Sequence, residues 1–225
     1  MRDFKGQAIV LKRTNYGEAD RILQLITEDG KLSVLAKGVR KERSRLAGGI
    51  ELFSLSEICV HHGKGELGVL TGARLIEFYS SICGNLDAME FAGSCLRDVP
   101  KRSEQVDSPD FFNLLAQTLR ELNRHLPKID LIRAWWLLNL ARASGEDVNL
   151  RVDTSGNKLR PDKTYSWNSA DNALELSDGH GNITSDHIKL MRLMVSAPLA
   201  LILNVQNTSS LTGDISYIAK CIAQA

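Results

Sequence analysis

The sequence has few residues that could build a disulfide or metal framework. Its 225 residues include four cysteines, and no two of them have the C-x-x-C spacing of a zinc or redox motif. They are scattered in apolar surroundings, where a free cysteine behaves as a small hydrophobic residue. We therefore expect neither a disulfide framework nor a cysteine-based zinc site. The four are Cys59, Cys83, Cys95 and Cys221.

Motifs for nucleotide binding and hydrolysis are also missing. The chain contains no Walker A sequence and no G-x-S-x-G nucleophile turn. One string, Gly63 to Gly68 (GKGELG), matches G-x-G-x-x-G. A dinucleotide fingerprint requires those glycines to open a helix. Here the strand-like run Val69-Leu70-Thr71 follows, so the pattern predicts a hairpin turn and no cofactor site.

Long apolar runs are absent as well. The longest apolar stretch, Leu193 to Val205, is interrupted by Ser196, Pro198 and Asn204 and is too short to span a bilayer. The first residues, MRDFKGQAIVLKR, lack the apolar core of a signal peptide. A hydrophobic content of 43% is sufficient for an ordinary core. We expect a soluble, cytoplasmic protein with no membrane contact.

Net charge is nearly absent, but its distribution is uneven. The whole chain carries +1, whereas residues 1–80 carry a net +3 and the remainder a net −2. Within the first part, five cations fall in nine positions of the stretch AKGVRKERSRLAGG, and they are Lys37, Arg40, Lys41, Arg43 and Arg45. Arginine forks and lysine ammonium groups both bind phosphates, and such binding depends on salt. This loop predicts a phosphate-binding surface; a solvated loop that aids solubility is the alternative.

The first third of the sequence is typical of a small β-barrel. Short apolar runs at residues 7–12, 21–27, 31–37, 51–62 and 67–76 are separated by turn signals, including Asn15-Tyr16-Gly17 and Asp29-Gly30. Asp-Gly between two apolar runs is a strong hairpin signal. Five strands in about 75 residues match the oligonucleotide-binding (OB) barrel.

From about Phe78 the pattern becomes helical. Ser108-Pro109-Asp110 predicts a helix start, and the run 128–144, apolar on all sides, predicts a buried helix that ends at Gly145. Further helices are expected at 186–195, 198–203 and 214–223, after a polar insertion at about 146–184 that reads as a loop or weak hairpin. The predicted fold is α+β: an N-terminal five-stranded OB-type β-barrel (1–79) followed by a C-terminal α-helical bundle (80–225).

Candidate catalytic and metal-binding groups do not form a convincing set. His180, Asp186 and His187, with Asp178, could bind a metal, but their spacing fits no ligand pattern. Glu18 and Asp20 could be an acid pair, although a turn-stabilising pair bridged to a nearby Arg or Lys is favoured.

Several aromatic residues have two possible roles. Trp135 and Trp136 lie in the helix that is apolar on all sides, which favours core packing over a stacking platform. Aromatic rings of single-strand-binding barrels stack on bases. Four rings of the first part could do so or could instead pack in the core or at a hinge, and they are Tyr16, Phe53, Phe78 and Tyr79.

An ordered series of short motifs in residues 6–80 resembles one family. The series comprises GQAIVL (6–11), YGEADRIL (16–23), TEDGK (27–31), AKGVRK (36–41), SRL (44–46) and ELF (51–53). It resembles the N-terminal domain of the bacterial recombination mediator RecO. A looser similarity runs through residues 111–122, 136–145 and 155–159.

The resemblance implies a non-enzymatic DNA-repair protein without a cofactor or small-molecule substrate, associated with the nucleoid. Members of the family bind single- and double-stranded DNA, anneal strands, work with RecR and help to load RecA onto DNA coated by single-stranded-DNA-binding protein (SSB). Some bind the acidic C-terminal tail of SSB through the helical domain. The implied DNA contacts are first Lys37, Arg40, Lys41, Arg43 and Arg45, and second Lys12, Arg13 and Arg21.

One departure concerns the four-cysteine zinc module that many RecO proteins carry. Val152 and Ser155 stand where its first cysteine pair is expected, and no cysteine pair follows near residues 179–187. We therefore predict no zinc. The alternative to a DNA-binding mediator is a protein-interaction adaptor with little DNA affinity. A basic rim for the SSB tail could come from Arg133, Arg142, Lys189 or Arg192, with no assignment among them.

Overall fold

The computed structural model describes residues 3–63, 67–102, 110–177 and 179–222. The chain forms two compact units, Met1–Leu126 and Pro127–Ala225. The first unit contains β1 (Phe4–Tyr16), β2 (Asp20–Thr27), β3 (Gly30–Ala36), η1 (Ala47–Gly49), β4 (Ser54–His61), β5 (Gly68–Phe78), α1 (Ser80–Cys83), α2 (Leu86–Arg102) and α3 (Asp110–Arg124). The second contains α4 (Ile129–Ala143), β6 (Tyr165–Asn168), β7 (Ala173–Leu176), α5 (Ser185–Ser196), α6 (Leu199–Ile202) and α7 (Thr212–Ile222), with the 3-10 turn η2 (Leu126–Lys128) at the junction.

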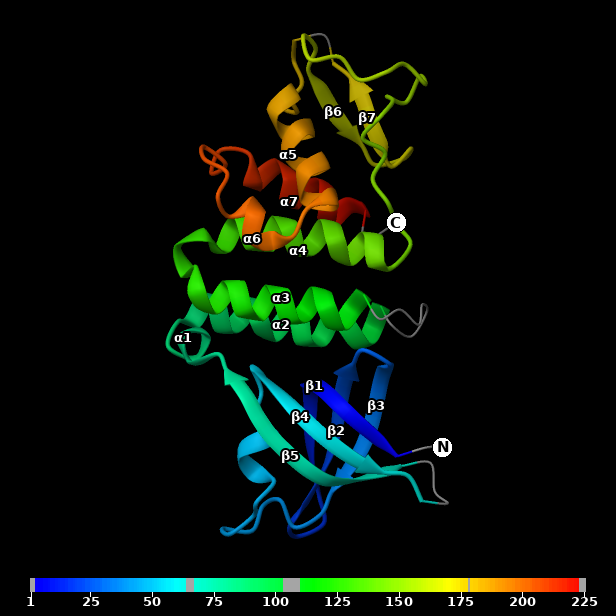
Figure 1. The fold of residues 1–225 in the computed structure, drawn as a ribbon. Coiled ribbons are helices and arrows are strands. Elements are labelled where there is room, and N and C mark those ends of the chain that lie inside the picture. Colours follow the sequence, from blue (N-terminus) through cyan, green and yellow to red (C-terminus); the bar gives the residue numbers. More distant parts are fainter. Residues whose placement is uncertain (1–2, 64–66, 103–109, 178, 223–225) are drawn as a thin grey trace. The chain divides into compact units, whose positions relative to one another are not determined.

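The five strands of the first unit close into a barrel in the order β1-β2-β3-β5-β4 (Figure 1). All neighbouring strands are antiparallel except β3 and β5, which pair in parallel through Val34 with Gly68 and Leu35 with Val69. The predicted Asp29-Gly30 hairpin is present, and Thr27 faces Gly30 across it. The barrel and the helices that follow confirm the α+β prediction.

The barrel interior is filled by aliphatic side chains from every strand. Fully burying one such side chain stabilises a fold by roughly 1.5–3 kcal/mol relative to leaving it exposed. The β1–β2 register shifts at a bulge between Val10 and Lys12. Residues 8–11 of β1 are all buried, and the strand becomes mostly exposed after this bulge. The core cluster comprises Ala8, Val10, Leu23, Leu25, Val34, Ala36, Val39, Ile50, Ile58, Val60 and Leu70.

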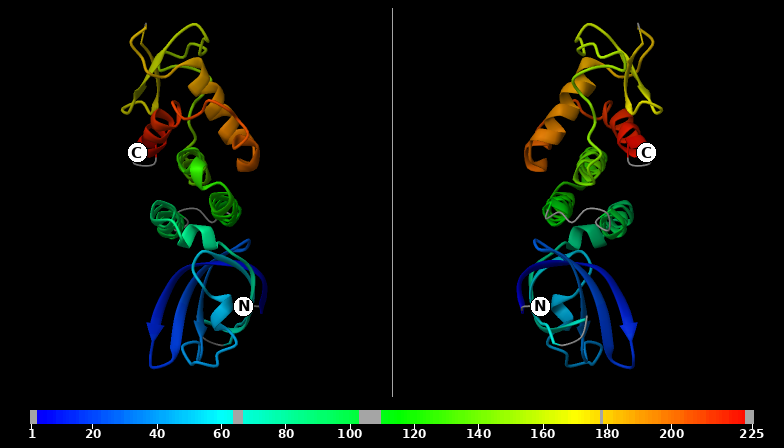
Figure 2. Two further views of the ribbon diagram at one scale, coloured as in Figure 1. Left: turned by 90° about the vertical axis from the view of Figure 1, so that its left-hand side faces the viewer. Right: turned by 90° about the vertical axis from the view of Figure 1, so that its right-hand side faces the viewer.

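Helices α2 and α3 cover one end of this barrel in Figure 1. The β1–β2 turn and the connection between β3 and β4 lie at the other end, as both views in Figure 2 show. The predicted helix start at Ser108-Pro109 lies outside the described residues, and α3 begins at Asp110. The central part of the predicted turn after Gly63 is also outside them. No described helix is both long and apolar enough to cross a membrane.

The second unit is built around α4. Trp135 and Trp136 are both buried in it, which confirms their predicted core role. The helix ends where the sequence predicts, because Gly145 adopts a left-handed conformation with φ of 86°. There the Gly145 N–H donates to the Arg142 carbonyl, and the Glu146 N–H donates to the Ala141 carbonyl, both at 2.9 Å.

The polar insertion forms the weak hairpin β6–β7, preceded by a tight turn at residues 152–158. In that turn the buried Asp153 carboxylate accepts the backbone N–H groups of Ser155 at 3.0 Å and Asn157 at 2.9 Å. Val152 pairs with Lys158 across the turn. Val152 has no metal-binding atom and Ser155 offers only a neutral hydroxyl, so these positions do not fit a thiolate zinc site. Hydrogen bonds to one carboxylate hold this turn together.

Replacing Asp153 by Ala should destabilise the protein by about 1–3 kcal/mol, because two backbone N–H groups lose their acceptor in a buried turn. For a chain of this size each kcal/mol corresponds to a melting temperature lower by roughly 2–4 °C. Thermal denaturation followed by circular dichroism measures the change. Asp171→Ala, which removes an exposed carboxylate in the β6–β7 turn, is the control. Equal melting temperatures for both variants would contradict the structural role of Asp153.

Candidate nucleic-acid interface

The stretch of residues 37–45, here called the basic loop, lies between β3 and η1. The side chain of Val39, in the middle of its first turn, is only 3% exposed and belongs to the barrel core. Leu46, just after the basic loop, packs against the same core. Because Val39 near its start is inserted into the core and Leu46 just after its end packs against it, the basic loop is attached to the barrel at both ends.

Two hydrogen bonds tie the basic loop to the neighbouring β1–β2 turn. The Gly38 N–H donates to Asp20 Oδ1 at 2.6 Å, and the Arg40 N–H donates to the Ala19 carbonyl at 2.9 Å. Gly38 has φ of 63°, a conformation that side chains with a Cβ rarely adopt. The sequence favours an Arg or Lys partner for Asp20, whereas the structure places the Gly38 backbone N–H against this carboxylate. An acid at the first position of a strand is a weak sequence signal for such a role.

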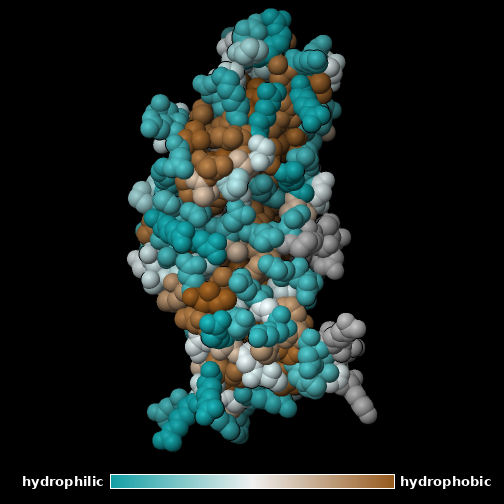
Figure 3. Space-filling view, viewed as in Figure 1, coloured by the Kyte–Doolittle hydropathy of each residue, from teal (hydrophilic) through white to brown (hydrophobic). Residues whose placement is uncertain are grey.

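All five cations of the basic loop are exposed to solvent. Among the residues that the structure describes, none of them forms an ion pair with a carboxylate. The Arg40 guanidinium donates to the Gly17 carbonyl at 3.3 Å, which keeps its charge. In Figure 3 hydrophilic side chains project from this end of the barrel. The result is a group of uncompensated positive charges on an anchored backbone, a suitable surface for a polyanion.

The three second-rank residues differ in availability. Lys12 is exposed on β1. Arg13 is half-buried and its guanidinium lies 2.6 Å from Glu51 Oε2, so a carboxylate already compensates its charge. Arg21 is half-buried and donates to the Asn15 side chain at 3.2 Å. The structure thus brings five of the eight predicted cations together on one loop and leaves Lys12 accessible on the adjoining strand.

A shallow hollow beside the basic loop is lined by charges of both signs. Glu18 and Asp20 contribute carboxylates, and Lys37 and Lys41 contribute ammonium groups. Because one Asp20 oxygen is already bonded to Gly38, the two carboxylates are not a free acid pair. The hollow therefore has no excess of positive charge and is not an anion pocket.

The four candidate stacking aromatics separate by burial. Tyr79 is fully buried, and this burial raises its pKa to about 12. Phe53 is half-buried with φ of 55°, and its carbonyl accepts the Tyr79 N–H at 3.0 Å. Phe78, at the end of β5, is 43% exposed, and Tyr16, at the end of β1, is 56% exposed. Only Tyr16 and Phe78 therefore present much of their rings to solvent.

Two of the four residues weighed as metal ligands, His187 and Asp186, have other partners, and Asp178 lies outside the described residues. The His187 Nδ1 accepts the Thr184 N–H at 3.2 Å in a capping arrangement at the start of α5, and its Nε2 lies 3.3 Å from Asp214. Asp186 pairs with Lys189 at 3.0 Å. Within the described residues no three His, Cys, Asp or Glu side chains gather as metal ligands do. All four cysteines are free thiols.

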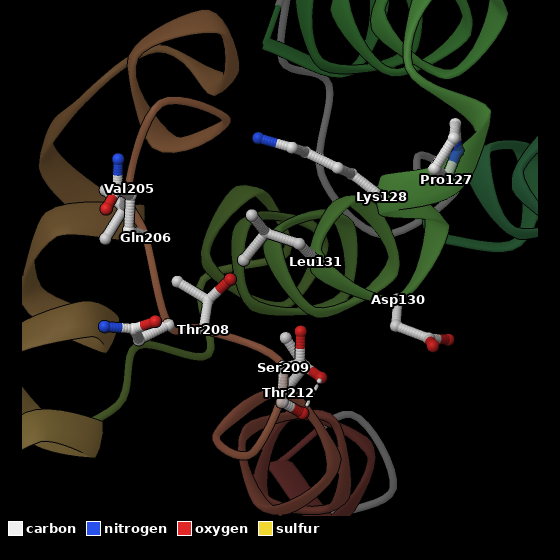
Figure 4. A pocket seen from close by; sticks show the side chains of 10 residues that line it. Pro127, Lys128, Asp130, Leu131, Val205, Gln206, Thr208, Ser209 and Thr212 are labelled. Atoms are coloured by element: carbon white, nitrogen blue, oxygen red, sulfur yellow. Dashed lines mark hydrogen bonds between the residues drawn. The ribbon is translucent and has the colours of Figure 1, made fainter.

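A second hollow, shown in Figure 4, lies wholly within the second unit. The start of α4 contributes Lys128, Asp130 and Leu131, and the segment 205–212 forms the opposite wall. The Lys128 ammonium donates to the Leu203 carbonyl, so its charge is already engaged. The remaining polar groups on the lining are mostly neutral amides and hydroxyls, and we assign no ligand to this hollow.

Two family models match the chain on either side of its first helices. The model described as "Recombination protein O N terminal" matches residues 1–79, which correspond to the barrel. The model described as "Recombination protein O C terminal" matches residues 102–222, more than half of the chain. The predicted domain boundary after residue 79 stays a prediction.

Curated relatives agree with these matches. "DNA repair protein RecO" of Dehalococcoides mccartyi is 38% identical over 153 residues, which cover 66% of this chain and 59% of the relative. The protein of that name from Heliobacterium modesticaldum is 40% identical over 116 residues, covering 51% and 42%. That of Bacillus pumilus is 35% identical over 121 residues, covering 53% and 47%. The chain matches less than two thirds of the length of each of these relatives, and on the strength of both family models it belongs to the RecO family.

Proposed function

We propose that this protein is a non-enzymatic, DNA-binding mediator of recombination and repair. One observation carries the proposal: five exposed cations, which have no carboxylate partner among the described residues, sit on a loop that is anchored to the barrel. A solvated loop that served solubility alone would not need its backbone held by Asp20 and its valine inserted into the core. An anchored loop presents its charges in a constant arrangement, which lowers the entropic cost of binding a polyanion.

Phosphate contact explains how such a surface would act on DNA. Each neutralised phosphate releases condensed counterions, and this release provides affinity without reading the base sequence. A surface that holds the backbones of two strands leaves their bases free to pair. Annealing of complementary strands would follow from this arrangement without any chemical step, so no catalytic residue is required.

The partners we propose follow from family membership. They are single- and double-stranded DNA, RecR and the C-terminal tail of SSB, with RecA loaded indirectly. One pocket of the second unit suits an acidic peptide with an apolar end. This pocket, here called the peptide pocket, has the apolar lining residues Leu159, Pro161 and Ile188, and its other lining residues are Arg160, Ser185, Lys189 and Arg192.

The three cations that line the peptide pocket differ in the partners that they already bind. Arg192 donates twice to the Leu150 carbonyl, at 3.1 and 2.6 Å, and so supports the fold. Lys189 and Arg160 are exposed and form surface pairs with Asp186 and Asp162. Exposed pairs contribute at most about 1 kcal/mol, so an incoming acidic peptide competes with them readily. Lys189 is therefore the most informative residue to change.

Removing three charges of the basic loop should weaken DNA binding and flatten its dependence on salt. If the five cations each neutralise one phosphate of a single strand, the slope of log K against log salt is about −3.5, and Arg40→Ala, Lys41→Ala and Arg43→Ala together reduce it to about −1.4. Fluorescence anisotropy of a labelled oligonucleotide at several salt concentrations gives both slopes.

The control for this experiment removes the same charge elsewhere. Arg151, Lys158 and Lys220 are exposed on the second unit, and changing all three to Ala should leave the slope unaltered. Equal slopes for the wild type and the basic-loop variant would refute the assigned site. An absence of DNA binding by the wild type at low salt would favour the adaptor alternative.

Reversing the charge of Lys189 tests the peptide pocket. Lys189→Glu should weaken binding of a synthetic acidic peptide with an aromatic C-terminal residue by tenfold or more, because attraction becomes repulsion at the pocket rim. Isothermal titration calorimetry measures the dissociation constant. Lys220→Glu makes the same charge change on exposed α7 and should have no effect. If both variants weaken peptide binding equally, the binding depends on the overall charge of the protein and not on this pocket.

A further inference from the structure

The outer face of β1 places an aromatic ring in line with a cation. Past the bulge at Val10–Lys12, β1 is exposed at Lys12 and at Thr14 to Tyr16, and Arg13 is half-buried. The alternate positions of this stretch are Lys12, Thr14 and Tyr16. Alternate residues of a strand point to the same face, so these three form one outward row. Tyr16 lies four positions after Lys12 on the strand, a distance of about 13 Å between their Cα atoms. The Tyr16 side chain, at the end of this row, is 56% exposed.

The basic loop is hydrogen-bonded to the β1–β2 turn, next to Tyr16. Tyr16 pairs with Asp20 across the β1–β2 hairpin, and residues that pair in this way project from the same face. The Asp20 carboxylate accepts a hydrogen bond from the Gly38 N–H. The carbonyl of Gly17, the residue after Tyr16, accepts a hydrogen bond from the Arg40 guanidinium. The residue that pairs with Tyr16 and the residue that follows it are thus both bonded to the basic loop, which places the Tyr16 backbone next to that loop.

Ring and cations recognise different parts of a nucleic acid. Phosphates are present in single strands and duplexes alike, so the cations of the basic loop do not separate the two forms. An aromatic face stacks on a base only when that base is unpaired and accessible. A solvent-exposed ring next to a phosphate-binding loop therefore selects for single strands.

We propose that Tyr16 is a base-stacking residue that gives this interface its preference for unpaired bases. The inference rests on the proposed function, because stacking requires that the basic loop bind the backbone. Affinity for single strands then has two separable parts, a salt-dependent part from the cations and a largely salt-independent part from the ring. Affinity for duplex DNA has only the first part.

Phe78 offers a matched control for the exposed ring. It is also an exposed aromatic residue of the same unit, at 43%. It is the last residue of β5 and precedes α1, at the barrel end that adjoins the helices (Figure 1). Its position away from the basic loop predicts that Phe78→Ala binds DNA as the wild type does.

Three ligands of equal length separate the two contributions. They are a labelled oligothymidine, the same backbone with abasic sites throughout, and a blunt duplex. Anisotropy titrations of the full chain are made with the wild type, Tyr16→Ala, Tyr16→Phe and Phe78→Ala, each checked for folding by thermal denaturation. The abasic ligand tests stacking on the unaltered protein, so the experiment does not depend on any variant remaining folded.

The expected results are specific to stacking. Tyr16→Ala should lose about tenfold in affinity for oligothymidine, ~1.4 kcal/mol, with no change for the duplex and an unchanged salt slope. Tyr16→Phe should retain the wild-type affinity. The wild type should bind the abasic ligand about as weakly as Tyr16→Ala binds oligothymidine, and Tyr16→Ala should not distinguish these two ligands.

Other outcomes overturn the inference and are distinguishable from failure of the proposed function. If Tyr16→Ala binds oligothymidine like the wild type, or loses affinity for duplex equally, the ring is no stacking residue, even though the basic-loop variant still shows phosphate binding. Equal wild-type affinity for abasic and normal strands has the same meaning. A wild type that binds none of the three ligands overturns the DNA-binding function, and this inference with it.

Discussion

Closure of the barrel through β3 and β5 is the constraint on which the position of the basic loop depends. In the closed order β1-β2-β3-β5-β4, strand β4 is not a neighbour of β3, so the chain must cross one end of the barrel between them. That crossing segment carries the five cations. Its apolar residues Val39 and Ile50 enter the core, which gives the segment a place in the barrel even though most of its charged side chains face water.

Around this segment, the burial of a cation goes together with whether it has a side-chain partner. Where a barrel cation is half-buried it has a defined partner, as Arg13 has Glu51 and Arg21 has Asn15. Where cations are exposed on the basic loop, the structure supplies no carboxylate among the described residues. The Asp20 carboxylate, which lines a hollow together with Lys37 and Lys41, accepts the Gly38 backbone N–H. One acid thus anchors the loop without neutralising its side chains, which is the arrangement that phosphate binding needs.

In the second unit, a carboxylate holds a tight turn in place. A tight turn at residues 152–158 is organised by Asp153, whose buried carboxylate gathers backbone N–H groups of the following residues. In family members with a four-cysteine module, a metal would occupy this part of the chain. Here the residues at the first pair of positions have no thiolates, and hydrogen bonds to a carboxylate hold the turn. The hairpin that follows has two strands of four residues each, and it buries Tyr165 and Leu174.

The sequence by itself determined the five strands, the helices of the second unit and the location of the cations, because apolar periodicity, glycine turns and charge density are local properties. A short local pattern was enough to predict each of three features: the Asp29-Gly30 turn, the apolar helix around Trp136 and the run of cations from Lys37 to Arg45. Only the tertiary structure decided which of these side chains are available. Arg13 meets Glu51 across 38 positions, and Asp20 meets Gly38 across 18. Tyr16 stays exposed whereas Tyr79 is buried. Such outcomes depend on strand register and barrel closure, which bring distant residues together and which no local pattern contains.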